Sequence, residues 1–439
     1  PEEAQRYASD LTAPEVERRE RALGGLHGSV GPPAELLPIV IKCLQDPEPS
    51  IRAGAIGALS AWPLEKDRAL LVTRALSDDA ADVRDAAVSC LSGLEPVPEE
   101  VLRAVASLLH VSGTTVRSAA LEVLMNWGVA SRPVETAIAQ LLNDAESGVR
   151  ETAAAALEAM GPTSRASLEA LGAAVHDPDW AVRLAAVWAL NEAGAAASAV
   201  AADLDAALAD SDRRVCVQAA AILWRLDPAA EDARAVLTAA LGEEDPGTLA
   251  ARLLAETGAR AAPLLRLALN SRSRDVRAAA AVGLSERGEQ AAWAVPELTR
   301  ALADPDNIVR GRAILALAAV GASARVAGPE LARAALEDDN AYNRVSAGYA
   351  LGRLGVHEDV AVRALVQELR SGNEELREQA AQYLGGLRQR GRDAIPALEK
   401  ALRSPSGRVR TAAAAALREI RNAGVAEPGP GQDRSRPSR

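Results

Sequence analysis

Apolar and polar residues recur along the chain with the period of an α-helix. In residues 309–321, an aliphatic residue and an arginine are followed by Ala three residues after the arginine, Leu seven after it and Gly eleven after it. At 100° per residue, the positions one before and three, seven and ten after the arginine share a stripe about 80° wide, which predicts a helix buried on one side. The glycine suits a left-handed turn that ends the helix.

A shorter apolar-periodic segment lies between successive copies of this pattern and often opens with proline, as in residues 296–302 and 396–402. Proline is favourable at the first position of a helix because the N–H that it lacks would have no partner there. Each interval therefore predicts a helical hairpin with a first helix, a turn and a second helix.

The hairpin pattern occurs thirteen times, and the interval is 32 or 33 residues wherever the aliphatic-Arg series is uninterrupted. Self-similarity at such a period predicts stacked repeats, in which each thin hairpin is stabilised by its neighbours. Arg19 and Arg344 continue the register after other residue types, and Cys216 and Gly247 occupy the arginine position of two further copies. The aliphatic-Arg pairs are Ile51-Arg52, Val83-Arg84, Val116-Arg117, Val149-Arg150, Val182-Arg183, Val276-Arg277, Val309-Arg310, Leu376-Arg377 and Val409-Arg410.

We therefore predict one all-α solenoid of about 12–13 hairpins over residues 1–424. Residues 425–439 are rich in Pro, Gly, Ser and Arg, which predicts a disordered tail. The spacing falls to 31 and 30 residues on the two sides of Gly247, which indicates either a local bend or decay of the repeat.

An acidic residue often lies six positions before the arginine, in the predicted turn between the two helices. It either caps the second helix and orders the turn, or pairs with an arginine of its own or the neighbouring repeat. Both roles are structural. The residues are Asp46, Asp78, Asp144, Asp177, Asp210, Asp304 and Asp338.

Segments such as residues 344–355 resemble the HEAT-like repeats of the phycobilisome-lyase type, and the resemblance extends from about residue 10 to 424. It implies a right-handed α-α superhelix whose Asp and Arg positions form a ladder of hydrogen bonds. It also implies that the second helices line the concave side. Scaffolds, adaptors and a few enzymes share such repeats, so the resemblance indicates architecture more than function.

Composition fits thin helical layers, because apolar residues make up 49% of the chain while Phe is absent and only six Trp and four Tyr occur. The net charge of −11 opposes binding to a phosphate backbone, so no nucleic-acid partner is expected. No apolar run reaches the roughly 18 residues of a membrane span, so no membrane insertion is expected. Three scattered cysteines favour a reducing, cytoplasmic location. We expect a monomer.

Candidate chemistry is sparse. The histidines His27, His110, His176 and His357 fall in different repeats, which opposes a catalytic triad or a metal site. His357-Glu358 resembles the His-Glu pairs of deoxyhypusine hydroxylase, but that iron site needs several such pairs, so a solvated turn histidine is expected. We predict no catalytic residue, no metal and no cofactor.

The outward positions of the second helices change character along the chain. Early and late copies present charged residues, whereas the central copies present apolar ones, and Trp62 and Trp127 fall in the buried arc instead. Two interpretations remain open: neighbouring helices half-bury the central set, or the set forms an apolar groove for a partner. The central set is Trp180, Leu184, Trp188, Val217, Trp224, Val282, Leu315, Val345 and Tyr349.

The function that we predict is a non-catalytic scaffold that binds a helix or peptide of a protein partner on its concave face. One alternative is a lyase-type enzyme or maturation factor acting on a tetrapyrrole or protein-bound substrate, for which Cys216 is the candidate group. Another is a structural spacer or assembly module. The predicted partner-binding residues are Trp180, Leu184, Trp188, Val217, Trp224, Arg225, Arg252, Leu315 and Tyr349.

Overall fold

A computed structural model describes residues 2–29 and 31–423, and this part of the chain contains helices and turns without a strand. The predicted tail, residues 425–439, lies outside the described residues. Thirteen hairpins are present in the described part, as the repeat count predicts. The arginine position, or Cys216 or Gly247 in its place, falls near the start of each second helix.

The helices fall into first and second members of the hairpins. The first helices are α1 (Glu2–Leu11), α3 (Leu37–Cys43), α5 (Lys66–Ala75), α7 (Glu99–Ser107), α9 (Glu135–Gln140), α11 (Arg165–Ala174), α13 (Ala201–Ala206), α15 (Glu231–Ala240), α17 (Ala262–Leu269), α19 (Val295–Ala301), α21 (Gly328–Glu337), α23 (Glu358–Ser371) and α25 (Ile395–Ala401). The second helices are α2 (Val16–His27), α4 (Pro49–Leu59), α6 (Ala81–Ser92), α8 (Thr114–Trp127), α10 (Ser147–Met160), α12 (Trp180–Glu192), α14 (Arg213–Leu226), α16 (Asp245–Glu256), α18 (Arg274–Glu286), α20 (Asn307–Val320), α22 (Ala341–Leu354), α24 (Glu374–Gly386) and α26 (Gly407–Asn422). Short 3-10 helices occur at Ala34–Leu36, Leu108–His110, Gly128–Val134, Leu141–Asn143, Gly194–Val200, Ala207–Ala209, Gly258–Ala261, Gly288–Ala294, Gly321–Ala327 and Arg388–Ala394.

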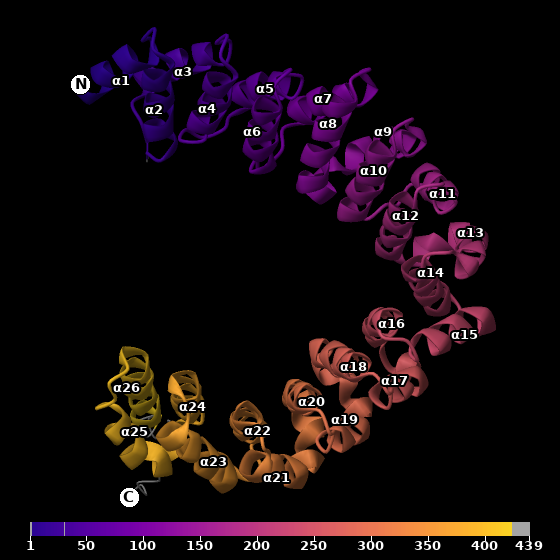
Figure 1. Cartoon of the computed structure of the whole chain (residues 1–439), viewed down its shortest axis with the longest axis vertical. Helices are drawn as coiled ribbons and strands as arrows, with labels where there is room; N and C mark the ends of the chain where they lie inside the picture. The colour runs from indigo at the N-terminus through magenta and orange to yellow at the C-terminus, as the bar shows by residue number, and fades with distance from the viewer. Residues whose placement is uncertain (1, 30, 424–439) are drawn as a thin grey trace, which may run out of the picture. The chain divides into compact units, whose positions relative to one another are not determined.

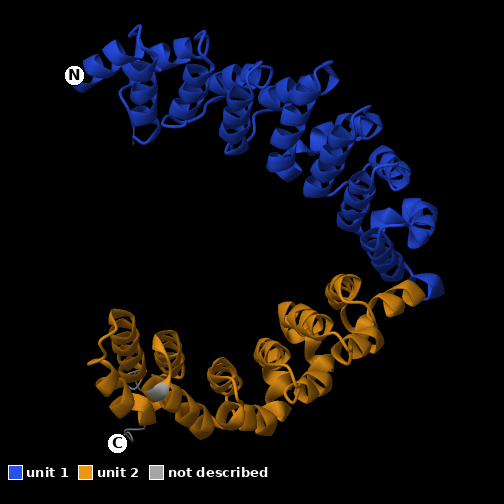
Figure 2. Cartoon of the chain, in the orientation of Figure 1, with its two compact units in different colours: residues 1–233 blue, residues 234–439 orange. Residues whose placement is uncertain are grey.

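The chain divides into two compact units, residues 1–233 and 234–439, with the boundary inside α15 (Figure 2). Within each unit, the first helices form one layer and the second helices form another, which lies on the inner side of that unit's curve (Figure 1). Consecutive second helices pack directly on one another in each unit. The prediction that second helices line a concave side therefore holds within each unit.

The core of a hairpin follows the predicted stripe and extends beyond it. In α20, Val309, Ala313 and Leu317 are buried as the pattern predicts. Ile314 and Ala318 are buried as well, although they fall outside the stripe. The reason is that a second helix packs against its own first helix and against the second helices on both sides, so its buried arc is wider than that of a helix lying on one surface.

Ion pairs join consecutive hairpins within each unit in an Arg–Asp ladder. In one rung, Arg150 Nε lies 2.7 Å from Asp177 Oδ2, and Arg150 Nη1 donates to the Asp144 carbonyl oxygen of its own turn at 2.9 Å. The Asp177 carboxylate also accepts the Asp179 N–H at 2.9 Å. One carboxylate therefore orders its own turn and holds the preceding hairpin. The rungs among the described residues are Arg19–Asp46, Arg52–Asp78, Arg117–Asp144, Arg150–Asp177, Arg183–Asp210, Arg277–Asp304, Arg310–Asp338 and Arg344–Glu368.

This ladder decides between the roles predicted for the turn acids. Pairing with the arginine of the neighbouring repeat and ordering of the turn are both confirmed. Capping of the second helix belongs to a different residue, two positions later: Asp179 and Asp306 accept the N–H groups of Ala181 and Ile308. The acid that forms the rung lies too far ahead of the helix to reach those N–H groups.

Residues 307–337 are long and apolar enough to cross a membrane, but half of their most apolar stretch is buried inside the molecule. The stretch is also divided at Gly321, which has a φ of +73° and ends α20 before α21 begins. These properties are those of core helices in a repeat hairpin.

Candidate functional site

The residues predicted to bind a partner lie on second helices of both units. Unit 1 holds six of them, on α12 and α14, and unit 2 holds Arg252, Leu315 and Tyr349 on α16, α20 and α22. The two groups therefore form two separate candidate surfaces. Each surface is described within its own unit.

The surface of unit 1 is centred on two tryptophans of α12. Trp180 is 50% exposed and Trp188 is 42% exposed, so both present large apolar rings to solvent. The Arg214 guanidinium of α14 lies 4.5 Å from the centroid of the Trp180 ring, in cation–π contact. Exposure of two Trp side chains on one helix is unusual for a soluble surface. We call Trp180 and Trp188 the tryptophan pair.

Three other residues of the predicted surface are buried, so the prediction that they face outward is wrong. Leu184 is 4% exposed, Val217 is 0% exposed and Trp224 is 6% exposed. In α14, every residue from Val215 to Trp224 is buried, because helices flank it on several sides. The alternative of burial between neighbouring helices is the correct interpretation for these three side chains.

Arg225 is half-buried and has a structural partner. Its Nη2 donates to the Asn191 carbonyl oxygen at 3.0 Å, near the C-terminus of α12. A guanidinium at a helix C-terminus satisfies carbonyl groups that have no partner within the helix. Arg225 therefore joins α14 to α12, which places it beside the helix that carries the tryptophan pair.

Two carboxylates near the C-terminal ends of α10 and α12 repel each other. Glu192 lies four residues after Trp188, so the two side chains share a face of α12. Burial raises the pKa of Glu158 on α10, and the nearby charge of Glu192 raises it further. The face of α12 beside Trp188 is thus negatively charged and favours a cation, whereas the Trp180 ring already contacts the Arg214 guanidinium.

The surface of unit 2 is smaller and only partly exposed. Leu315 is 37% exposed, whereas Tyr349 is half-buried and stacks on Tyr383 with ring centroids 4.6 Å apart. Arg353 Nη1 donates to the Tyr349 hydroxyl at 3.4 Å. Arg252 is exposed on α16.

Two further members of the central apolar set lie in unit 2. Val282 is half-buried and Val345 is buried, so Val345 does not face outward. Val345 packs into the core cluster of the last hairpins.

Sequence reasoning missed exposed residues at the start of two second helices. Ile308 and Tyr342 are both exposed, and each lies two residues before the arginine of its repeat. The Tyr342 hydroxyl donates to Glu375 Oε2 at 3.0 Å. The sequence signal for them was an apolar side chain in the first turn of a second helix, at a position where most other copies of the repeat carry a polar residue.

Cys216 occupies the arginine position but does not resemble a nucleophile. Its Sγ donates to the Asp210 carbonyl oxygen at 3.0 Å, in place of the guanidinium of other repeats. Burial raises the pKa of the Cys216 thiol, which lowers the fraction of reactive thiolate at neutral pH. Cys43 and Cys216 are buried, whereas Cys90 is half-buried. The structure therefore does not support the role considered for Cys216.

Trp62, Trp127 and His357 lie where the sequence predicts. Trp62 and Trp127 are buried, and Trp127 Nε1 donates to the Leu91 carbonyl oxygen at 2.8 Å. His357 is exposed in the turn before α23, with a φ of +48°. Its neighbour Glu358 begins α23 and pairs with Arg390 at 3.0 Å.

The repeated hairpins, the Arg–Asp ladder and the exposed inner face agree with a family comparison. The model of the HEAT repeats family matches four segments that together exceed half of the chain: residues 9–92, 134–223, 261–352 and 362–428. The chain belongs to the HEAT-repeat family. This match is to HEAT repeats in general and does not support the narrower phycobilisome-lyase type.

Solved structures place this HEAT-repeat protein among long solenoids. Importin β is similar with a TM-score of 0.57, Kap95p with 0.53 and a Kap121p mutant with 0.50, each at 14% identity. Alignments cover 96–97% of this chain and 67%, 62% and 53% of those chains, respectively. The chain thus spans between half and two thirds of their length. Comparison with curated proteins gives no match.

Proposed function

We propose that this HEAT-repeat protein is a non-catalytic scaffold that binds a protein partner through the tryptophan pair of unit 1. The observation that carries the proposal is the exposure of Trp180 and Trp188 on one helix of the inner layer. Tryptophan is enriched among the residues that dominate binding energy in protein interfaces. Burial of both rings against a partner would remove a large apolar area from water.

The negative charge beside Trp188 narrows the chemistry of the partner. Glu192 shares the face of α12 with Trp188, and its charge raises the pKa of the neighbouring Glu158. A lysine or arginine of the partner would relieve this repulsion. We therefore infer a partner segment with apolar anchors and basic residues. Kap95p, similar in fold, binds RanGDP, and this supports the use of such a solenoid as a binding surface.

We also infer the assembly, location and partner classes that the sequence predicts. The protein acts as a monomer in the cytoplasm, without a nucleic acid, a membrane or a cofactor. The net charge of −11 supports the exclusion of nucleic acid, since phosphate groups would be repelled.

The test compares partner capture by the wild-type protein and by the double variant Trp180→Ala/Trp188→Ala. We expect the double variant to lose at least about tenfold in affinity for any partner that binds here, as is typical of central interface residues. The melting temperature should stay close to that of wild type, because both rings are exposed. Val129→Ala removes an exposed apolar side chain elsewhere in unit 1 and serves as the matched control.

Iodide quenching of tryptophan fluorescence gives a second readout. Trp180 and Trp188 are exposed, Trp293 is half-buried, and Trp62, Trp127 and Trp224 are buried, so a captured partner should reduce the quenchable fraction. If partners bind the double variant as tightly as wild type, the binding surface lies elsewhere. If no partner shields the tryptophan pair from iodide and no partner is lost in the double variant, the spacer role replaces the scaffold role.

A further inference from the structure

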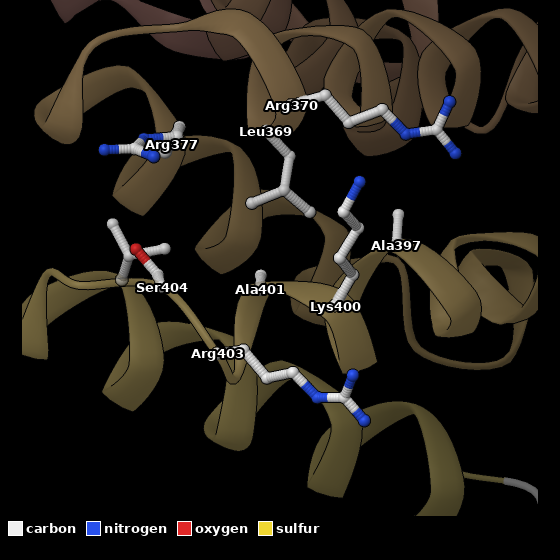
Figure 3. A pocket seen from close by; sticks show the side chains of 9 residues that line it. Leu369, Arg370, Arg377, Ala397, Lys400, Ala401, Arg403 and Ser404 are labelled. Atoms are coloured by element: carbon white, nitrogen blue, oxygen red, sulfur yellow. The ribbon is translucent and has the colours of Figure 1, made fainter.

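A basic pocket lies in unit 2 among α23, α24, α25 and α26 of the last two hairpins. Its volume is about 330 Å³, and no acidic residue is among the side chains that line it. Four cationic side chains line it in a protein whose net charge is −11. The lining residues are Leu369, Arg370, Arg377, Ala397, Lys400, Ala401, Arg403, Ser404 and Val409 (Figure 3).

One of these cations is an arginine of the Arg–Asp ladder without its acid. Arg377 stands at the same position of its repeat as Arg150 and Arg310, which hold a carboxylate at 2.7 Å and 2.8 Å. The residue that would supply the carboxylate to Arg377 is Ser404. Arg377 Nε is buried and has no hydrogen-bond partner among the described residues. A buried N–H without an acceptor is costly, so an external acceptor would be stabilised there.

The turn at Ser404 already has the geometry of a complete rung. Ser404 Oγ accepts the Ser406 N–H at 3.3 Å, as Asp177 Oδ1 accepts the Asp179 N–H at 2.9 Å. The Ser404 carbonyl oxygen accepts from Arg410 Nη1 at 2.8 Å, as other turns do from their own arginine. Only the carboxylate is missing, because serine is too short to reach the preceding arginine.

The cations are spread along the pocket. In Figure 3, Arg377 and Ser404 lie on one side, whereas Arg370, Lys400 and Arg403 lie on the other, with Leu369 and Ala401 between them. Several negative charges spaced along a chain would match both sides.

We propose that this pocket binds an acidic peptide segment of a protein partner, with one carboxylate completing the rung at Arg377 and further carboxylates beside Lys400 and Arg403. The apolar floor formed by Leu369, Ala397 and Ala401 contacts the aliphatic parts of the bound segment. This surface is distinct from the tryptophan pair and selects the opposite charge.

The experiment measures binding of a fluorescein-labelled hexaglutamate peptide with blocked ends to the full chain by fluorescence anisotropy. We expect binding that weakens as salt increases. Arg377→Gln should weaken it by about tenfold to a hundredfold, the range for a lost hydrogen bond to a charged group. Arg84→Gln is the matched control, since Arg84 is also a ladder arginine whose following acid position holds another residue, Val111, and it lies in unit 1.

Ser404→Asp provides a test that does not depend on removing a structural arginine. It supplies the missing carboxylate from within the chain, so it should raise the melting temperature by a few degrees while weakening peptide binding to the extent of Arg377→Gln. Unchanged peptide binding in Ser404→Asp and Arg377→Gln would overturn the proposal. Inorganic phosphate is the second probe, and binding of phosphate without binding of the peptide would also overturn it.

Discussion

At the scale of single residues, the stability of the solenoid depends on carboxylates that serve two hairpins at once. Asp177 accepts two hydrogen bonds from Arg150 and one from its own turn, and little of its side chain is exposed. Hydrogen bonds to charged groups in such positions contribute more than those at the surface, where water competes. The contribution of each ion pair to the free energy of unfolding therefore depends more on its burial than on its N–O distance.

A comparison of two pairs at the same distance tests this argument. Arg150–Asp177 and Arg165–Glu169 both have N–O separations of 2.7 Å, but side chains are 13% and 8% exposed in the first pair and 88% and 56% exposed in the second. Asp177→Asn should lower the free energy of unfolding by about 1.5–3 kcal/mol. Glu169→Gln should change it by at most about 0.5 kcal/mol. Urea titration followed by circular dichroism measures both, and equal effects would contradict the role of burial.

Acid should destabilise the protein through the same carboxylates. Burial alone would raise the pKa of Asp177, but hydrogen bonds from Arg150 and from the Asp179 N–H outweigh it, so the pKa is lowered from 3.8. A lowered pKa in the folded state stabilises the protein above the ordinary pKa and loses this contribution as the pH falls through the lowered value. The melting temperature should therefore drop below about pH 4. Asp177→Asn should show a smaller drop, and an equal one would exclude the Arg150–Asp177 rung as a cause.

At the scale of helices, close approach of second helices depends on small residues at the contacts. A Cβ added to Gly283 of α18 would lie 2.5 Å from the Ala255 Cβ of α16, which is closer than atoms can pack. By contrast, a Cβ added to Gly24, inside α2, would meet nothing within 4 Å. Alanine at the two glycines therefore has opposite expected effects.

Gly283→Ala should destabilise the protein by about 1–3 kcal/mol, because the two helices must move apart. Gly24→Ala should stabilise it by about 0.5–1 kcal/mol, because alanine restricts the unfolded chain and favours the helix. Thermal melts of the two variants against wild type measure the difference. A stabilising Gly283→Ala would show that α16 and α18 can separate without cost.

The same packing explains how far the sequence could predict the fold and the surface. Positions such as Val309, Ala313 and Leu317 follow the local period, so the hairpins and their register were predictable. Leu184 and Val217 were placed outward because a local pattern treats a helix as lying on one surface. Their burial depends on how neighbouring second helices rotate and approach, which the local period does not contain. The same local pattern placed Trp180 and Trp188 outward, and both are exposed.

At the scale of the molecule, the ladder is distributed unevenly. Among the described residues, unit 1 contains five rungs and unit 2 contains three, and the intervening repeats carry Cys216, Leu241 and Gly247 at the positions of arginine, acid and arginine. In repeat proteins, stability is close to a sum of repeat and nearest-neighbour terms. Two consecutive junctions without a rung, unlike the single gaps after Arg84 and Arg377, are therefore the expected place for cooperativity to fail.

We expect two calorimetric transitions in the full chain, with a van't Hoff enthalpy below the calorimetric enthalpy. Asp177→Asn should lower the transition of unit 1 alone, and Asp338→Asn should lower that of unit 2 alone. A single transition that both variants lower equally would show that the chain unfolds as one cooperative body.

Every rung of the ladder runs in the same direction along the chain: the guanidinium belongs to the earlier hairpin and the carboxylate to the later one. Cleavage at a rung would thus give an upstream fragment with a positively charged end and a downstream fragment with a negatively charged end. Such ends attract each other in only one orientation, so two fragments of a unit could reassemble in their original order but not in reverse.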